Sequence, residues 1–269
     1  MRVVVFGDME GVSGICRWAQ VSATGERYEE GRALYTAEMN AAVRGAFTGG
    51  ADEVVVMDCH GAGGDSSFNS LLAEELDDRC EFVVQSEWTE YIEPFEQGCD
   101  AALMVGMHAK AGSALGVMSH TVSSTNWHGL RFNGTAVGEV GINAALCGTW
   151  GCPVVLVTGD DVVCAESSAL LGDGLQTVAV KQGLGRFSAR HQPPARARAA
   201  IEEAARDALG SLAGAPIYEP GAPCTIEVEL ATPDHAEPYR HRAGVTISEG
   251  RSLTSTAGTW WEAWRQFYL

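Results

Sequence analysis

The sequence predicts an α/β protein built on a mostly parallel sheet flanked by helices, with a smaller C-terminal α+β subdomain. Apolar runs such as residues 3–6 and 54–57 show no polar alternation, which is typical of strands covered on both faces. Strand-like and helix-like segments also alternate along the first part of the chain, as they do where helices connect parallel strands. The chain therefore divides into a predicted α/β core of residues 1–190 and a subdomain of residues 191–269 packed on it.

Each element has a local signal. Apolar segments ending in polar residues predict five buried strands, at residues 3–7, 53–60, 80–86, 100–109 and 153–161. Apolar residues near helical spacing predict a helix at 28–47, which the Gly49-Gly50 pair ends, and further helices at 137–147 and 194–209. Asn133-Gly134 is a hairpin-turn signal among short β-prone pieces, and residues 225–230 alternate as a half-exposed strand.

Composition and charge exclude several classes of protein. The chain has 269 residues, 46% hydrophobic and 20% charged, and can bury a large core. Its formal charge of −17 argues against nucleic acid or an anionic membrane as principal partner. No apolar stretch approaches the roughly 18 residues of a membrane span, and the chain starts on a strand instead of a signal segment. The eight scattered cysteines form no C-x-x-C pair, so we expect reduced thiols in a cytoplasmic protein.

Polar residues at the strand ends predict where ligands bind. The first strand is followed by Asp8 and Glu10, whose side chains can converge because they are two residues apart on an extended chain. Later strands end in the polar residues Asp58, His60, His108, Asp160 and Asp161. Ligands of open parallel sheets bind beyond the carboxyl ends of the strands. Asp, Glu and His together suit zinc or a similar metal, although each residue alone is also explained as a cap or a solvated side chain.

Two further candidates follow the fourth strand. His120 lies twelve residues beyond His108 in G-V-M-S-H-T, and Glu139 opens the helix G-E-V-G-I-N-A. A carboxylate at a helix N-terminus is favourable without any ligand, and a histidine in a β-hairpin is commonly a surface residue. Composition and spacing do not choose between these explanations and a role in a metal site.

Seven segments occur together in an order that resembles the zinc-dependent D-aminopeptidase family of the DppA type. They are D-M-E-G-V-S-G, D-C-H-G, G-M-H-A-K-A, G-V-M-S-H-T, N-G-x-x-V-G-E-V-G-I-N-A, V-T-G-D-D and A-V-K-Q, and they cover roughly residues 1–190. The C-terminal third is similar to the family only in T-I-E-V-E-L and G-T-W-W-E-A-W. We expect the tryptophans of this last segment to pack on a subdomain or a neighbouring subunit instead of binding substrate.

The resemblance implies a two-zinc site and an activity. Its implied zinc ligands are Asp8, Glu10, His60, His108 and Glu139, with His120 as the catalytic histidine. It implies a homodecamer that removes N-terminal D-residues such as D-alanine from short peptides. Asp8 is the most plausible ligand to bridge two metals, and His120 acts either as general acid and base, which we favour, or as the attacking group. Asp58 is a candidate partner that orients His60, or a strand-end cap.

Other functions fit the same residues. A related amidohydrolase acting on a dedicated biosynthetic intermediate, or a phosphoesterase, would keep the metals and change the substrate. A non-catalytic zinc-binding oligomer would keep the metals without hydrolysis. Hydrolysis assays on D-peptides, L-peptides and phosphoesters discriminate among these alternatives.

Overall fold

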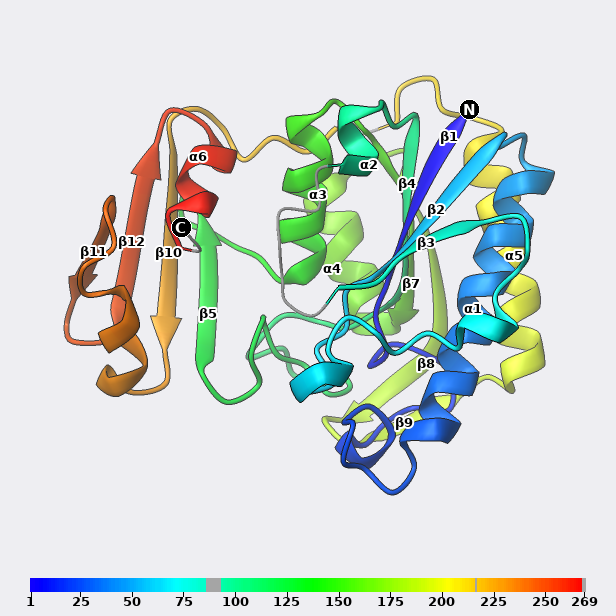
Figure 1. The fold of residues 1–269 in the computed structure, drawn as a ribbon, viewed down its shortest axis with the longest axis horizontal. Coiled ribbons are helices and arrows are strands. Elements are labelled where there is room, and N and C mark those ends of the chain that lie inside the picture. The colour runs from blue at the N-terminus through cyan, green and yellow to red at the C-terminus, as the bar shows by residue number, and fades with distance from the viewer. Residues whose placement is uncertain (86–92, 216, 268–269) are drawn as a thin grey trace.

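Two β-sheets organise the residues that the computed structural model describes, which are 1–85, 93–215 and 217–267 (Figure 1). The larger sheet is parallel except for its last pair, in which β9 runs antiparallel to β8. In spatial order its seven strands are β3 (Glu81–Val83), β2 (Glu53–Asp58), β1 (Arg2–Gly7), β4 (Ala101–Met107), β7 (Val154–Asp160), β8 (Gln176–Gly185) and β9 (Ser188–His191). The predicted fold class, a mostly parallel α/β sheet with a further α+β part, is confirmed.

Helices cover both faces of the larger sheet (Figure 1). One face carries α1 (Tyr28–Thr48) and α5 (Pro194–Leu209), and the other carries α3 (Glu139–Thr149) and α4 (Asp161–Leu171). Strand β1 is apolar throughout because both of its faces are covered. Val3 and Val5 join the core under α1 and α5, whereas Val4 and Phe6 join the core under α3 and α4. Burial on both faces removes the polar alternation of a half-exposed strand.

The smaller sheet is antiparallel and lies beside α3 (Figure 1). In spatial order its strands are β11 (Val245–Ser248), β12 (Ser252–Ala257), β10 (Cys224–Leu230), β5 (Trp127–Phe132) and β6 (Thr135–Ala136). Asn133 and Gly134 form the predicted turn between β5 and β6, with φ of 46° and 81°. The remaining helices are the short α2 (Glu93–Glu96), α6 (Trp260–Arg265) and the 3₁₀ segments Trp18–Gln20, Gly64–Ser66, Ala73–Glu75 and Pro233–Tyr239.

The sheets do not divide the chain at residue 190. Strands β5 and β6 precede this position and pair with each other, and β5 also pairs with β10, which follows it. Helix α5 follows residue 190 but packs against α1, on the face of the larger sheet remote from the smaller one (Figure 1). Local sequence signals identify such elements, whereas the sheet that an element joins depends on contacts distant in sequence.

The expectation that all eight cysteines are reduced is wrong. Cys99, just before β4, and Cys152, just before β7, form a disulfide. The sequence offered no spacing signal because 53 residues separate the two, and the proximity arises from the pairing of β4 with β7. The other six cysteines are free thiols, and all are at least partly buried.

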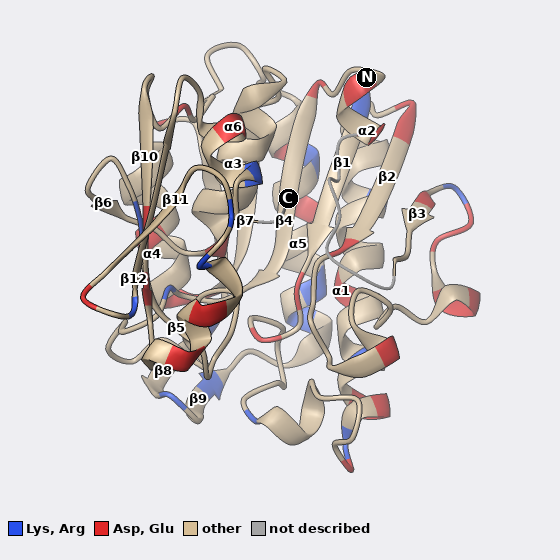
Figure 2. Ribbon diagram, turned by 60° about the vertical axis from the view of Figure 1, so that its left-hand side comes forward, with Lys and Arg blue, Asp and Glu red and all other residues tan. Residues whose placement is uncertain are grey.

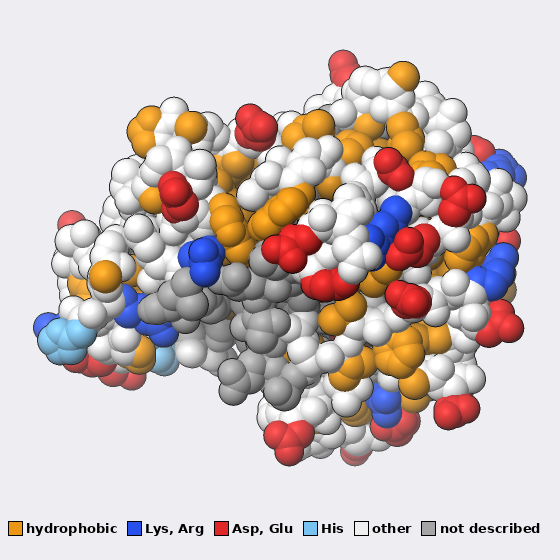
Figure 3. All heavy atoms as spheres, turned by 45° about the horizontal axis from the view of Figure 1, so that its top comes forward, with side chains coloured by type: hydrophobic (Ala, Val, Ile, Leu, Met, Phe, Trp, Pro, Cys, Tyr) orange, Lys and Arg blue, Asp and Glu red, His pale blue; other side chains and the backbone are white. Residues whose placement is uncertain are grey.

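Charge is dispersed over the surface. Figure 2 shows acidic residues on helices and loops of both parts of the molecule. On the face drawn in Figure 3, acidic side chains lie among neutral and apolar ones, without a broad basic field among the described residues. Within the same residues, no helix has both the length and the apolar character that crossing a membrane requires.

Candidate metal centre

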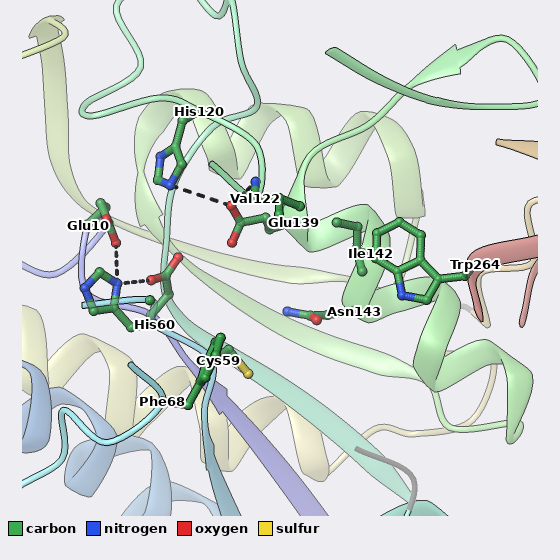
Figure 4. Close-up of a pocket in the computed structure, with 12 residues that line it drawn as sticks. Glu10, Cys59, His60, Phe68, His120, Val122, Glu139, Ile142, Asn143 and Trp264 are labelled. Atoms are coloured by element: carbon green, nitrogen blue, oxygen red, sulfur yellow. Dashed lines mark hydrogen bonds and ion pairs between the residues drawn. The ribbon is translucent and has the colours of Figure 1, made fainter. Parts of the chain in front are cut away.

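The six predicted site residues come together at the carboxyl-terminal edge of the larger sheet. Figure 4 labels four of them, Glu10, His60, His120 and Glu139. They follow three neighbouring strands and begin one helix: Asp8 and Glu10 follow β1, His60 follows β2, His108 and His120 follow β4, and Glu139 is the first residue of α3. Parallel strands bring residues distant in sequence to one edge, which is the physical basis of this convergence.

The loop after β1 is held close to the end of β4. The Asp8 N–H donates to the Val105 carbonyl at 2.9 Å, and the Gly11 N–H donates to the Gly106 carbonyl at 2.7 Å. A Cβ atom at Gly106, whose φ is 74°, would lie 2.0 Å from the Asp8 carbonyl oxygen. Only glycine accepts both this backbone conformation and this close approach. Gly106 thereby allows His108 and Asp8 to meet.

Asp8 lies between two histidines. Its Oδ1 is 3.0 Å from His60 Nδ1, and its Oδ2 is 3.3 Å from His108 Nε2. Glu10 Oε2 is also 3.0 Å from His60 Nδ1, so the two carboxylates do converge on one point. The two oxygens of Asp8 thus face different histidines, so this carboxylate contacts both parts of the candidate ligand set.

Backbone carbonyls hold the three histidines. His60 Nε2 lies 2.7 Å from the Val21 carbonyl, His108 Nδ1 lies 3.0 Å from the Ala109 carbonyl, and His120 Nδ1 lies 2.9 Å from the Met118 carbonyl. Each carbonyl is placed to accept an N–H, and in a neutral imidazole this leaves the other nitrogen as an electron-pair donor, which is the form that binds a metal. In all three residues that second nitrogen faces a carboxylate.

Glu139 connects His108 to His120. Its Oε1 is 3.2 Å from His108 Nε2 and 3.8 Å from His120 Nε2, and it also accepts the Val122 N–H at 2.8 Å. The two imidazole rings stack with centroids 3.9 Å apart. The loop that carries His120 has positive φ at the non-glycine residues Met118 and Val122. Such strain, roughly 1–3 kcal/mol per residue, is retained mainly at functional sites.

Electrostatics at the centre favour bound positive charge. Burial acts to raise the pKa of Asp8, but the hydrogen bond from His60 and the charge of His108 outweigh it and hold that pKa well below its usual range. Burial likewise acts to lower the pKa of His108, but Glu139, Asp8 and Glu10 raise it to about 10. Buried carboxylates therefore stabilise a cation at this point. For His120, burial and the charge of His108 lower the pKa, which favours the neutral imidazole.

The residues fit a metal. Asp8 Oδ2, Glu10 Oε2 and His108 Nε2 are buried without a hydrogen-bond partner among the described residues, and such atoms are costly unless something else binds them. Donor atoms lie within 4.8 Å of one another in two groups, one of Asp8, Glu10 and His108 and one of His108, His120 and Glu139. Carboxylate and imidazole donors suit zinc. His120, predicted as catalytic, thus also lies in a group able to hold an ion.

Three strand-end carboxylates serve other purposes. Asp58 accepts hydrogen bonds from the Tyr35 hydroxyl at 3.1 Å and from the His60 N–H at 3.1 Å, and so it holds the loop that contains His60. Asp160 accepts the Val163 N–H at the start of α4 and the Val117 N–H. Asp161 accepts the Gly183 N–H at 2.8 Å. Asp160 and Asp161 therefore stabilise loops around the centre without entering it.

A cavity of about 160 Å³ opens onto the centre (Figure 4). Its walls add residues that sequence analysis missed, namely Cys59, Gly61, Phe68, Val122, Ile142 and Asn143, together with Trp264 of α6. Trp264 packs against Trp260 of the same helix and Phe132 of the smaller sheet, and it also reaches this cavity. The spacing of Ile142 and Asn143 from Glu139 was an available signal, since residues three and four apart share a helix face.

A parallel α/β sheet whose strand ends gather carboxylates and histidines beside a cavity defines a metal-dependent hydrolase type of site. The family model described as D-aminopeptidase matches residues 1–269. The D-aminopeptidase of Bacillus subtilis (strain 168) is 32% identical over 257 residues, which are 93% of this chain and 89% of the relative. This chain therefore belongs to the D-aminopeptidase family, which is a family of peptidases.

A solved structure agrees with this assignment. The Zn-dependent D-aminopeptidase DppA from Bacillus subtilis, described as a self-compartmentalizing protease, superposes with a TM-score of 0.91 at 28% sequence identity. The match covers 100% of this chain and 96% of the other, so it includes both sheets. The family resemblance predicted from seven sequence segments is confirmed.

Proposed function

We propose that this protein is a zinc-dependent aminopeptidase that releases the N-terminal residue, a D-residue such as D-alanine, from short peptides. In this proposal Asp8, Glu10, His60, His108 and Glu139 hold two zinc ions per subunit, and His120 is the catalytic group. The observation that carries the proposal is the convergence of all six residues, five of which, all except His108, also line one cavity. Membership of the D-aminopeptidase family supports the reaction class.

The positions of individual residues indicate their roles in the proposed hydrolysis. When bound, a zinc pair lowers the pKa of water to about 7 and polarises the scissile carbonyl. Asp8 would help to hold the metal on both sides of the centre, since one of its oxygens faces His60 and the other faces His108. His120 accepts the proton of the attacking water at Nε2 and returns it to the leaving amine, since the Met118 carbonyl holds the proton of Nδ1. Its lowered pKa keeps Nε2 available as a base near neutral pH.

We further propose a homo-oligomer, as a decamer, and a cytoplasmic location. The similar solved structure is described as a self-compartmentalizing protease, which supports assembly of several subunits. In such an assembly the cavity would face an enclosed space that admits short peptides and excludes folded proteins.

A substrate panel tests the reaction. Protein purified without chelator is assayed for zinc by elemental analysis and for hydrolysis of D-alanyl peptides, matched L-peptides and phosphoesters. We expect zinc and release of the N-terminal D-residue. His120→Ala should keep its zinc and lose roughly 10²–10⁴-fold in turnover, the usual contribution of a general acid or base. His128→Ala, an exposed histidine on β5, is the matched control and should retain activity.

Each result has a defined meaning. Absence of metal would overturn the ligand assignment, and unchanged turnover in His120→Ala would overturn the catalytic role of that residue. Hydrolysis confined to phosphoesters, or zinc binding without hydrolysis of any panel member, would overturn the aminopeptidase proposal.

A further inference from the structure

Asn143 is a polar side chain without a partner in the cavity beside the metal centre. It lies on α3 four residues after Glu139, so both side chains project from the same face of the helix. Only 3% of Asn143 is exposed, yet its carboxamide makes no hydrogen bond with any described residue. Figure 4 shows it in the space between His60 and Glu139 on one side and Trp264 on the other.

The amide atoms of Asn143 are not among the fully buried polar atoms that lack a partner, so they open onto the cavity that the residue lines. A carboxamide offers one acceptor oxygen and two N–H donors to whatever occupies that cavity. Ile142 beside it shows that an apolar residue fits the cavity wall, so the amide of Asn143 adds hydrogen-bonding groups that packing alone does not require. The carboxamide is therefore available to bind a molecule in the cavity.

The contacts of the other cavity residues leave no residue assigned to recognition of the substrate's amino group. The carboxylates and histidines face one another as the candidate ligand set. The Cys59 thiol is directed at the Met57 carbonyl, and burial raises the pKa of this thiol, which keeps it neutral. Phe68, Val122 and Ile142 are apolar and suit a small side chain. An aminopeptidase must also recognise the free amino group that distinguishes the first residue of its substrate.

We propose that Asn143 is a specificity-determining residue whose side-chain oxygen accepts a hydrogen bond from the free α-amino group of the substrate. The apolar wall of Phe68, Val122 and Ile142 then receives the side chain of the same residue. This inference rests on the proposed aminopeptidase function and adds to it how a peptide is recognised by its N-terminus. It defines the substrate class as small α-amino acyl compounds with an unblocked amine.

Two substitutions separate the acceptor from the donors. Asn143→Leu keeps the approximate shape and removes all hydrogen bonding, whereas Asn143→Asp keeps an acceptor oxygen and removes the N–H donors. With the zinc-loaded enzyme and a D-alanyl peptide, Asn143→Leu should raise KM about tenfold or more, as expected for loss of a hydrogen bond to a charged group. The KM of Asn143→Asp should stay within a few-fold of wild type. Zinc content and Tm establish that each variant is folded and loaded.

A pair of inhibitors isolates the amine. D-Alanine and propionate differ by the amino group, so the ratio of their inhibition constants measures how much that group contributes to binding. This preference should shrink about tenfold in Asn143→Leu and persist in Asn143→Asp. Asn40→Ala is the matched control, because the Asn40 side chain bonds to Glu75 and Asp77, outside the cavity residues.

The outcomes are distinguishable. An unchanged KM and inhibitor ratio in Asn143→Leu would overturn the recognition role while leaving the aminopeptidase function intact. If KM and the inhibitor ratio change as much in Asn143→Asp as in Asn143→Leu, the assignment of the side-chain oxygen as the acceptor is overturned. A wild-type enzyme that hydrolyses no peptide would instead overturn the proposed function, and this inference with it. If Asn143→Leu does not fold, Asn143→Ala removes the same hydrogen bond and decides the question.

Discussion

The candidate metal centre has two halves, which we call the first half (Asp8, Glu10 and His60) and the second half (His108, His120 and Glu139). Side chains of the first half are at most 5% exposed, and buried polar groups of the larger sheet hold their loops. In the second half Glu139 is 19% and His120 is 12% exposed, on a helix start and a strained loop. His108 is only 1% exposed, so the greater accessibility of the second half is confined to His120 and Glu139. The difference indicates that the first half supplies the more rigid, more deeply buried part of the centre.

His108 is where the two halves meet, so its loss should have the largest effect. Its Nε2 lies within 3.3 Å of a carboxylate from each half, at Asp8 Oδ2 and Glu139 Oε1. We expect His108→Ala to lose bound zinc and activity together, as measured by elemental analysis and peptide hydrolysis. His241→Ala, an exposed histidine outside the centre, controls for loss of a histidine. Full zinc content in His108→Ala would show that the halves bind metal independently of it.

The sequence predicted the first half better than the surroundings of the second. Asp8, Glu10 and His60 directly follow apolar strands, so the geometry of parallel strands brings them together. Asp160 also follows such a strand, yet it caps α4. Strand-end position alone does not distinguish a ligand from a cap, because the distinction depends on which way the next loop turns. Glu139 and His120 were predicted from the family resemblance of the ordered segments, because their spacing in the sequence did not distinguish them from a helix-start carboxylate and a surface histidine.

The cavity wall was least predictable. Trp264 lies on α6 of the smaller sheet's layer, and no periodicity in its own segment relates it to Glu139 or Asn143. Its place depends on how α6 packs beside α3, which is a contact between segments more than 100 residues apart in the sequence. Similarly, Lys181 follows an ordinary strand pattern, yet its side chain is buried under the first half. Such long-range packing has no local sequence signal.

Lys181 organises the loop of the first half, and its removal should have the second largest effect. Its ammonium donates to the backbone carbonyls of Glu10, Val12 and Ile15, and the residue is 2% exposed. Lys181→Met would leave these carbonyls buried without a donor, at about 1–3 kcal/mol each before relaxation. We expect the free energy of unfolding to fall by roughly 3 kcal/mol and zinc affinity to fall about tenfold, by analogy with residues that orient metal ligands.

Lys110 provides the matched control in the second half. It follows His108 by two residues and pairs with Glu166 at 2.8 Å, but its side chain is 32% exposed. Lys110→Met should therefore cost less than about 1 kcal/mol, as is usual for partly exposed ion pairs. Urea unfolding and zinc titration measure both variants. If Lys181→Met and Lys110→Met lose the same stability and the same zinc affinity, the inference that the first half is more rigid is contradicted.

The smallest predicted effect is a change of stability with pH. It involves His191, which contacts Gly14 in the loop that follows β1. His191 Nδ1 accepts the Gly14 N–H at 3.0 Å, and burial together with the charge of Lys181 lowers the pKa of His191 to about 4. Because this folded-state value lies below the unfolded value of about 6.5, His191 contributes stability above pH 6.5 that is lost as pH falls toward 4. Solvent screening of this half-buried group limits the loss to about 1 kcal/mol. His191→Gln, which does not titrate, should lose less stability than wild type between pH 6.5 and 4 in urea unfolding at fixed zinc concentration. His241→Gln is the exposed control, and identical pH profiles for His191→Gln and wild type would show that protonation of His191 does not loosen the first half.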